Sequence, residues 1–226
     1  MPADPGSARD VDLGLLIADL CGYTALTETH GGLRASGIVL QFERLAEASL
    51  EPGVAIINSV GDAVFCAGAD PLAVVRTALR LREAVEREPE FPNVRIGVHF
   101  GQIVERERRL FGAPINLTAR VAAHARGGQV LCTESITHAV RGRGGFELRP
   151  LGETRFRNVA YPVAVFELTR SGALASTSSI DPVCRMQVEV DRAAATIDYA
   201  GSTYCFCSAE CARMFAEAPQ LYVETG

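Results

Sequence analysis

The chain of 226 residues contains no lysine, because all 22 of its basic residues are arginine. A Walker-type phosphate-binding loop, a protein kinase and an enzyme that forms Schiff bases each need a lysine ammonium group, so these classes are excluded. The net charge of −5 also gives no support to nucleic-acid binding. We therefore expect no nucleic-acid partner.

Long hydrophobic runs are missing as well. No stretch of roughly 18 apolar residues occurs, so we expect no transmembrane helix and no membrane partner. The first ten residues, MPADPGSARD, lack a hydrophobic segment behind a basic start, which argues against a secretory signal. We expect a cytoplasmic protein whose thiols are mainly reduced.

The sequence divides into two parts of different composition. The stretch SGALASTSS at 171–179 is small, polar and without hydrophobic periodicity, and it predicts a flexible linker. Four of the seven cysteines follow it. We expect one domain over 9–170 and a small cysteine-rich α+β module, here called the tail, over 180–226.

Residues 9–170 alternate between strand-like and helix-like segments. We predict strands at 11–18, 54–58, 63–67, 94–104, 129–133, 146–151 and 163–168, and helices at 33–50, 71–85, 112–125 and 134–140. Asp70 and Pro71 are typical of a helix start, as N-cap and first-turn proline. Hairpins mixed with helical crossovers predict an α+β fold whose sheet carries helices on one face, with a ferredoxin-like β-α-β-β-α-β core as the natural candidate.

An aspartate, Asp62, lies in a tight turn between two apolar segments, in IINSVGDAVF. Aspartate is common in turns and could simply cap its own backbone there. In the predicted core, however, Asp19 ends the first strand and would stand next to Asp62. Two such carboxylates repel one another and would share a proton unless a cation lies between them. Two Mg²⁺ ions about 3.5–4 Å apart fit this requirement, and backbone amides of 20–24 could face a triphosphate.

Several segments occur in a distinctive order: DLCGYTALTE, SVGDAVFCA, RIGVHFGQIV, LFGAPINLTARVAAHARGGQVLCT and LGETRFRNVAYPVAVFEL. Together they resemble the catalytic domain of class III adenylyl and guanylyl cyclases over roughly 9–169, and the ordered series is more specific than any one segment. The resemblance implies the ferredoxin-like nucleotide cyclase fold. It also implies attack of a ribose 3′-hydroxyl on the α-phosphate of ATP, with GTP as a second candidate, to give a cyclic nucleotide for signal transduction and pyrophosphate.

The resemblance assigns catalytic roles to particular residues. Asp19 and Asp62 would bind a pair of Mg²⁺ or Mn²⁺ ions, with Leu20 lending a backbone carbonyl. Asn116 and Arg120 match the family's transition-state pair. Positions i and i+4 share a helix face, so the amide can orient the ribose while the guanidinium neutralises charge on the phosphate. Outside the context GAPINLTAR, such a pair would more often be an ordinary solvated helix face.

Other residues would bind the nucleotide. Gly22, Tyr23 and Thr24 could face the triphosphate through their backbone amides. The resemblance places Arg157 near the position that presents a cation to the terminal phosphates. Family members build each site from two chains, so a homodimer is implied, with the aspartates from one protomer and the asparagine and arginine from the other.

The positions that read the base depart from the family pattern. Adenylyl cyclases usually carry Lys and Asp, and guanylyl cyclases Glu and Cys, where this chain has Asn58 and Arg109. Asn58 can donate and accept at a purine edge. Arg109 can only donate, and it could equally belong to a solvated charged hairpin. The choice between ATP and GTP therefore stays open.

The tail contains DPVCRM, YAGSTYCFCSAEC and a final APQLY, and it resembles a YHS domain, a small module thought to bind heavy metals. Clustered thiolates in a reducing compartment favour Zn²⁺ or another soft metal over a disulfide. Ser208 can cap a short helix that presents Cys211 one turn beyond Cys207. The candidate ligands are Cys184, Cys205, Cys207 and Cys211.

The fourth ligand in the tail is left open by the sequence. No histidine follows residue 138, so Cys205, Asp181, water or a partner must supply it. Alternatively, the cysteines are small buried hydrophobes in a tiny core.

Two other functions stay open. A cyclase-like but silent nucleotide-binding or dimerisation module could be coupled to a metal-sensing tail. The retained aspartates and the Asn/Arg pair argue against it, whereas the departures at 58 and 109 favour it. Nucleotide binding without product would select it. A metallochaperone, in which the tail is the working part, requires transferable metal and indifference to nucleotide.

Overall fold

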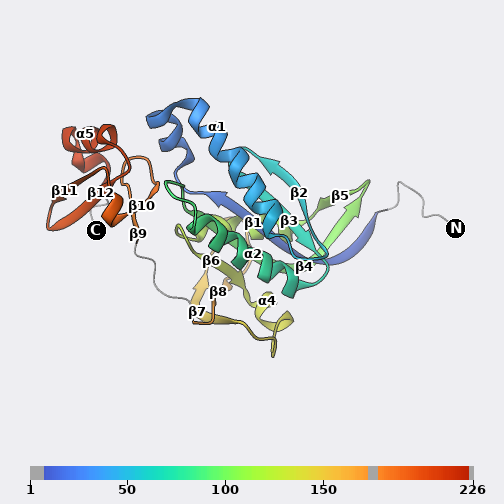
Figure 1. The fold of residues 1–226 in the computed structure, drawn as a ribbon. Helices are drawn as coiled ribbons and strands as arrows, with labels where there is room; N and C mark the ends of the chain where they lie inside the picture. The colour runs from blue at the N-terminus through green and yellow to red at the C-terminus, as the bar shows by residue number, and fades with distance from the viewer. Residues whose placement is uncertain (1–7, 173–177, 224–226) are drawn as a thin grey trace.

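The computed structural model describes residues 8–172 and 178–223. Strand β1 (Arg9–Leu20) lies in the middle of the main sheet, antiparallel to both β3 (Ala63–Gly68) and β4 (Val94–Arg106). The sheet order is β2-β3-β1-β4-β6-β8-β7, and β5 pairs with β4. The remaining strands are β2 (Val54–Val60), β5 (Arg109–Phe111), β6 (Val130–Thr133), β7 (Phe146–Thr154) and β8 (Val163–Arg170). The order β1-α1-β2-β3-α2-β4 confirms the predicted ferredoxin-like core (Figure 1).

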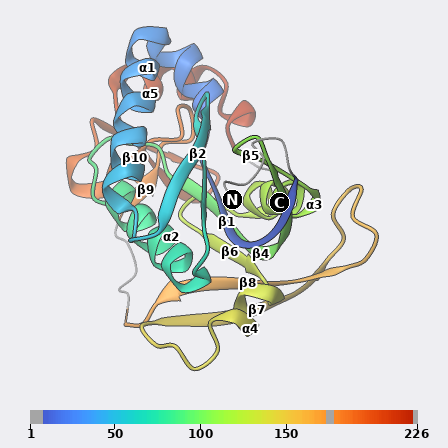
Figure 2. The same ribbon diagram turned by 90° about the vertical axis from the view of Figure 1, so that its right-hand side faces the viewer.

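Helices cover both faces of this sheet. Helices α1 (Tyr23–Ser49) and α2 (Pro71–Glu86) pack together on one face, and α3 (Ala113–His124) lies on the other, as Figure 2 shows. The short α4 (Glu134–Ala139) follows β6. The expectation of helices on one face only is therefore wrong for α3. Gly97 permits this close approach, since a Cβ there would lie 2.3 Å from the backbone nitrogen of Ala122.

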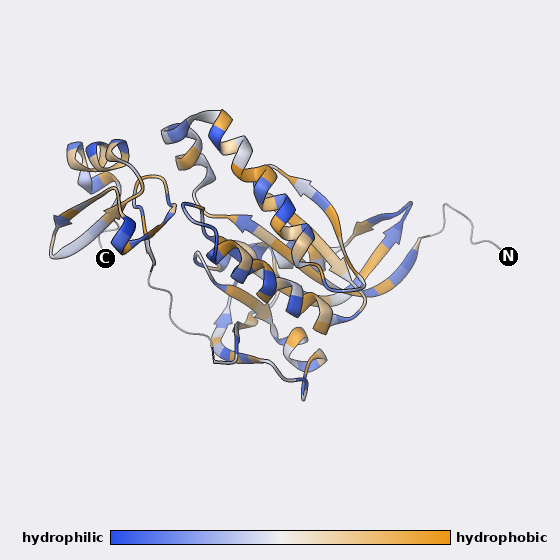
Figure 3. Ribbon diagram, in the orientation of Figure 1, coloured by the Kyte–Doolittle hydropathy of each residue, from blue (hydrophilic) through white to orange (hydrophobic). Residues whose placement is uncertain are grey.

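The alternation of residues along β1 separates two cores. Leu16, Ala18 and Leu20 belong to the large buried cluster beneath α1 and α2, whereas Leu15 packs with Ile103 on the α3 face. Successive side chains of a strand point to opposite faces, so each residue of β1 serves one core only. Hydrophobic and hydrophilic residues alternate around α1 and α2 in Figure 3. This pattern is the reason that the sequence predicted both helices.

The start of α2 agrees with the prediction. Asp70 has an extended backbone, and its Oδ1 accepts a hydrogen bond at 3.0 Å from the backbone nitrogen of Leu72, with Pro71 in the first turn. By contrast, α1 begins ten residues before the predicted start at Leu33. Gly31 (φ 78°, ψ 160°) leaves helical geometry and kinks the helix. The glycine pair at 31 and 32 hid the first segment, Tyr23–His30, from the periodicity.

The tail is a compact unit of short strands and one helix. Strand β9 (Ser178–Ile180) pairs with β10 (Gln187–Glu189), and β11 (Ala195–Tyr199) pairs with β12 (Ser202–Phe206). Helix α5 (Ala209–Glu217) follows, and two 3-10 turns lie at Val190–Arg192 and Pro219–Leu221. Within the predicted linker, 173–177 lie outside the described residues, and Ser178 and Ser179 already belong to β9.

The tail docks on the first domain at the N-terminal end of α1 (Figure 1). The backbone nitrogen of Gln187 donates to the carbonyl of Phe91 at 3.0 Å, and Met186 forms an isolated bridge with Pro92. Phe91, Met186 and Cys184 are buried in the same hydrophobic cluster. The two parts therefore share one core. None of the helices in the described ranges combines the length and apolarity needed to cross a membrane.

Candidate functional site

Two aspartates, Asp19 and Asp62, meet at the end of β1. Asp19 is the penultimate residue of β1 and lies opposite Ala63 in the register with β3. Asp62 occupies the turn between β2 and β3, where Gly61 has a φ of 59°. The backbone nitrogen of Leu20 donates to the carbonyl of Asp62 at 3.1 Å. The topology thus brings together the two acids that the sequence singled out, here called the acidic pair.

The two carboxylates differ in their electrostatic surroundings. Arg95 lies opposite Asp19 on β4, and its Nε donates to Asp19 Oδ2 at 2.7 Å, with Nη2 bonding the same oxygen. Asp62 forms no ion pair with any residue that the structure describes. Burial, and then the charge of Asp19, raise the pKa of Asp62. A cation between the two oxygens would relieve this repulsion, so the acidic pair fits hard divalent ions.

Asn116 and Arg120 lie one turn apart on α3, and both are exposed. They line a cavity of about 590 Å³ together with Arg157 and His99. Neither member of the acidic pair lines this cavity. The structure therefore groups three of the predicted residues, and it places them apart from the carboxylates of the same chain.

His99 is a residue of this cavity to which the sequence gave no catalytic role. Its Nδ1 lies 2.8 Å from Thr133 Oγ1 and 3.2 Å from Ser135 Oγ. Burial lowers the pKa of His99 to about 4. The ring is therefore neutral near pH 7 and is positioned by the two hydroxyls.

The loop expected at the triphosphate forms the start of α1. Gly22 is the N-cap with a left-handed φ of 75°, and its carbonyl accepts from the backbone nitrogen of Leu26 at 2.9 Å. Tyr23 and Thr24 begin the helix, and the amides at such a terminus favour anions. The side chain of Arg185 covers Gly22 closely, since a Cβ on Gly22 would lie 2.4 Å from Arg185 Cγ.

Three guanidinium groups gather beside this loop. Arg95, Arg126 and Arg185 line a cavity of about 680 Å³, together with Cys21 and Gly22. The sequence did not single out Arg95 or Arg126, because arginines of different elements carry no local signal of their proximity. Arg185 has a left-handed φ of 65°, a backbone conformation that glycine adopts more readily than arginine.

The two positions expected to read the base are both exposed. Asn58 lies at a bulge in β2, where the register with β3 shifts. Arg109 begins β5, and its guanidinium lies 5.6 Å from the centroid of the Phe111 ring. The preceding Glu107 and Arg108 have φ values of 51° and 60° and form a tight turn. Arg109 thus lies in a charged hairpin formed by β4 and β5.

A cluster of sulfur and nitrogen atoms lies where the tail meets α1. It comprises His30, Cys184, Cys207 and Cys211, whose ligand atoms all lie within 4.8 Å of one another, and we call it the junction cluster. All seven cysteines are free thiols. Hydrogen bonds from Cys184 and Cys207 lower the pKa of Cys211. Cys205 is buried on β12 and is not part of the cluster.

Asp181, which the sequence offered as a fourth ligand, has a different position. It is completely buried, and its Oδ1 accepts from the backbone nitrogens of Val183 at 2.8 Å and Cys184 at 3.3 Å. Its Oδ2 accepts from the backbone nitrogen of Cys207 at 2.9 Å. The carboxylate therefore holds two cysteine-bearing loops together through their backbones.

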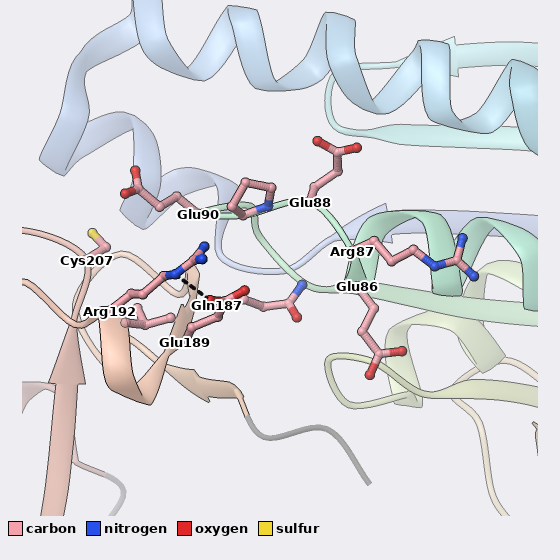
Figure 4. A pocket seen from close by; sticks show the side chains of 10 residues that line it. Glu86, Arg87, Glu88, Glu90, Gln187, Glu189, Arg192 and Cys207 are labelled. Atoms are coloured by element: carbon pink, nitrogen blue, oxygen red, sulfur yellow. Dashed lines mark ion pairs between the residues drawn. The ribbon is translucent and has the colours of Figure 1, made fainter. Parts of the chain in front are cut away.

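A smaller cavity of about 140 Å³ lies beside Cys207, between β10 and the segment that follows α2 (Figure 4). It is rich in glutamates, but these are already engaged. Glu90 pairs with Arg34 and Glu189 with Arg192, while Glu86 pairs with Arg82 and Glu88 accepts from Gln41. We assign no ligand to this cavity.

Comparison with known proteins gives two family matches. Residues 7–168 match the adenylate and guanylate cyclase catalytic domain, and residues 179–225 match the YHS domain. The chain is 34% identical over 169 residues to a pH-sensitive adenylate cyclase of Mycobacterium tuberculosis, covering 74% of this chain and 42% of that protein. It is 33% identical over 115 residues to an adenylate cyclase of Streptomyces griseus, covering 50% of this chain and 29% of that protein. The chain thus spans less than half the length of these relatives.

Solved structures agree on the fold. An adenylate cyclase from Trypanosoma brucei in its monomeric state superimposes with a TM-score of 0.65 at 20% identity, covering 73% of this chain and 91% of that chain. The adenylyl cyclase CyaB from P. aeruginosa gives a TM-score of 0.62 at 17% identity, covering 75% of this chain and 100% of that chain. At these identities the similarity concerns the fold alone.

Proposed function

Because the chain belongs to the family of adenylate and guanylate cyclase catalytic domains and continues into a YHS domain, we propose that it converts ATP, with GTP as a second candidate, into the 3′,5′-cyclic nucleotide and pyrophosphate. The observation that carries this proposal is the acidic pair at the end of β1. Its two carboxylates come from separate elements, and one of them has no cationic partner among the described residues.

The acidic pair is proposed to hold a pair of Mg²⁺ or Mn²⁺ ions, with the backbone carbonyl of Leu20 as a further oxygen ligand. Bound there, the ions would supply activation of the ribose hydroxyl and neutralisation of the phosphates. Arg95 occupies only one oxygen of Asp19. The other carboxylate oxygens are thus available as ligands.

The remaining steps use the chain's own residues. The amides of Gly22, Tyr23 and Thr24, at the positive end of α1, hold the terminal phosphates. Arg120 donates to the α-phosphate as the ribose 3′-hydroxyl attacks it. The hydroxyl proton passes to solvent water, the bond to the β-phosphate breaks, and the electron pair of that bond leaves with pyrophosphate. Asn116 orients the ribose, and Arg157 in the same cavity neutralises the leaving group.

Each active site is proposed to form between two protomers. Asn116 and Arg120 line a cavity that excludes the acidic pair of their own chain, and both side chains are exposed. In a symmetric dimer, the acidic pair of one protomer can face the α3 pair of the other, which gives two equivalent sites.

The experiment is a product assay with ATP, GTP and CTP in the presence of Mn²⁺ or Mg²⁺. We expect Asp62→Asn to reduce turnover to background and Arg120→Ala to reduce it by about 10²–10³-fold, the usual effect of removing one donor at a developing charge. Mixing equal amounts of the two variants should restore about a quarter of the wild-type rate, because about half of the dimers then contain one intact site. A mixture as inactive as its components would contradict the shared site.

A second candidate is a cyclase-like domain that binds nucleotide without converting it. The side chains at the two base-reading positions favour it. Asn58 is exposed at a bulge, and Arg109 lies over the Phe111 ring, so no contact among the described residues positions either side chain for reading a base. Calorimetric binding of ATP by a protein that forms no product would select this candidate.

A further inference from the structure

The junction cluster contains residues from both modules, although the sequence placed all its metal ligands in the tail. His30 belongs to the first segment of α1, and the three cysteines belong to the tail. We propose that His30 completes a Cys₃His site for a soft divalent cation such as Zn²⁺, and that the bound ion ties the catalytic domain to the tail. This inference does not depend on the cyclase activity.

The distances suit a tetrahedral ion. Cys184 Sγ and Cys207 Sγ lie 3.4 Å apart, and Cys207 Sγ and Cys211 Sγ lie 3.7 Å apart. His30 Nε2 lies 3.7 Å from Cys207 Sγ and 3.8 Å from Cys211 Sγ. Zn–S bonds of about 2.3 Å and a Zn–N bond of about 2.0–2.1 Å at tetrahedral angles place neighbouring ligand atoms roughly 3.5–3.8 Å apart. Four of the six separations are therefore close to those expected around one ion, and all six lie within 4.8 Å.

The backbone around the cluster is held by hydrogen bonds before any ion binds. Asp181 receives backbone N–H groups from the loops of Cys184 and Cys207. Ser208 Oγ accepts from the backbone nitrogen of Cys211 at 3.2 Å and caps α5, as predicted from the sequence. Outer-shell bonds of this kind orient metal ligands. Packing of soft cysteines alone would not require such a framework.

The other candidates for the fourth ligand fit less well. Cys205 lies outside the group of atoms within 4.8 Å, and the carboxylate of Asp181 is engaged by three backbone N–H groups. Three thiols and an imidazole prefer Zn²⁺ to the hard ions Mg²⁺ or Ca²⁺. The junction site and the acidic pair should therefore select different metals.

Further contacts place the cluster beside the triphosphate loop. Arg185, next to Cys184, covers Gly22, and Arg34 lies 3.9 Å from Met186 Sδ as well as pairing with Glu90. The tail therefore contacts the first segment of α1 at two places: Arg185 lies against Gly22, and Cys207 and Cys211 lie beside His30. An ion bound to His30 would fix the end of this segment that is farther from the loop.

The test uses the purified full-length chain, reduced and stripped with a chelator, and titrated with Zn²⁺ and with Co²⁺ as a spectroscopic probe. We expect one ion per chain and the absorption bands of tetrahedral, thiolate-bound Co²⁺. His30→Ala should weaken Zn²⁺ binding by at least about 100-fold, because loss of an outer partner alone costs 10–100-fold. His30→Cys should restore most of the affinity.

The controls distinguish loss of a ligand from loss of structure. His124→Ala removes a histidine outside the cluster, and Cys205→Ser removes a buried cysteine outside it. Both should retain wild-type affinity, and circular dichroism should show each variant to be folded. Equal Zn²⁺ affinity of His30→Ala and the wild type would overturn the proposal. A Cys205→Ser variant that is folded but loses the ion would do the same.

Discussion

His99 shows how a single partly buried side chain makes stability depend on pH. Its ring is held by Thr133 and Ser135 and has a pKa of about 4, compared with 6.5 as its ordinary value. Between these two values the unfolded chain binds a proton that the native protein does not bind. The free energy of unfolding must therefore fall as the pH falls through this window.

We expect His99→Gln to remove this dependence. Between pH 7 and pH 5, the unfolding free energy of the wild type should fall by about 2 kcal/mol more than that of the variant. Urea denaturation at the two pH values measures the difference. His138→Gln is the matched control, because His138 is largely exposed on α4. Identical pH dependence of His99→Gln and the wild type would contradict the lowered pKa.

For individual residues, the sequence predicted those site members whose positions follow from local strand and turn patterns. Asp19 and Asp62 could be placed together because one ends a strand and the other turns a hairpin that the fold pairs with it. His30 could not be found in this way. It lies 177 residues from Cys207, and only the docking of the tail brings the two together. Cys205 was a candidate only because it is close to Cys207 in sequence.

Among the elements, α3 lies so close to the sheet that Gly97 has no room for a side chain. A Cβ at Gly97 would lie 2.6 Å from the carbonyl oxygen of Thr118 and still closer to the backbone nitrogen of Ala122. Backbone atoms cannot rotate away as a flexible side chain can. The position of Asn116 and Arg120 relative to the sheet therefore depends on the absence of a side chain at this one residue.

We expect Gly97→Ala to displace α3, to cost about 1–3 kcal/mol of stability, and to reduce turnover by about 10²-fold, the typical effect of a shift of about 1 Å in reacting groups. Chemical denaturation and the product assay measure the two effects. Gly37→Ala is the matched control, since a Cβ at Gly37 in α1 meets no atom within 4 Å. It should leave turnover unchanged and stabilise the helix by about 0.5–1 kcal/mol. Turnover at the wild-type rate in Gly97→Ala would contradict the inference that the position of Asn116 and Arg120 depends on Gly97.

The sequence predicted most elements through their periodicity and caps, including the start of α2 at Asp70. It did not predict that α3 crosses the opposite face. Periodicity identifies the buried side of a helix but not the side of the sheet that receives it. The first segment of α1 was missed for a related reason, because the glycines at 31 and 32 interrupt the hydrophobic pattern.

In the molecule as a whole, the first domain and the tail belong to different sequence families but share one hydrophobic core, so we expect them to fold as one unit. Phe91 of the first domain is 2% exposed, and Met186 and Cys184 of the tail are fully buried in the same cluster. A linker of small polar residues suggested independent modules. The sequence could not reveal the shared core, because hydrophobic residues near a boundary do not identify their partners.

We therefore expect a single cooperative thermal transition for the full chain. Saturating Zn²⁺ at about 1,000 times its Kd should stabilise the protein by about 4 kcal/mol and raise Tm by roughly 10 °C. Calorimetry with and without chelator measures the shift, and His30→Ala should lose most of it, whereas His124→Ala should retain it. Two separate thermal transitions, of which Zn²⁺ shifts only one, would contradict the prediction that the domain and the tail unfold together.

The kink in α1 has a mechanical consequence. Gly31 leaves helical geometry and interrupts the helical hydrogen bonding of α1. The turns before Gly31 are therefore not rigidly coupled to the longer part of the helix, which packs on the sheet. At one end of these turns, the side chain of Arg185 packs against Gly22. At the other end, the imidazole of His30 lies beside the thiols of Cys207 and Cys211. If the tail moves relative to the sheet, we expect the chain to bend at this glycine, about 140 residues before the boundary suggested by composition.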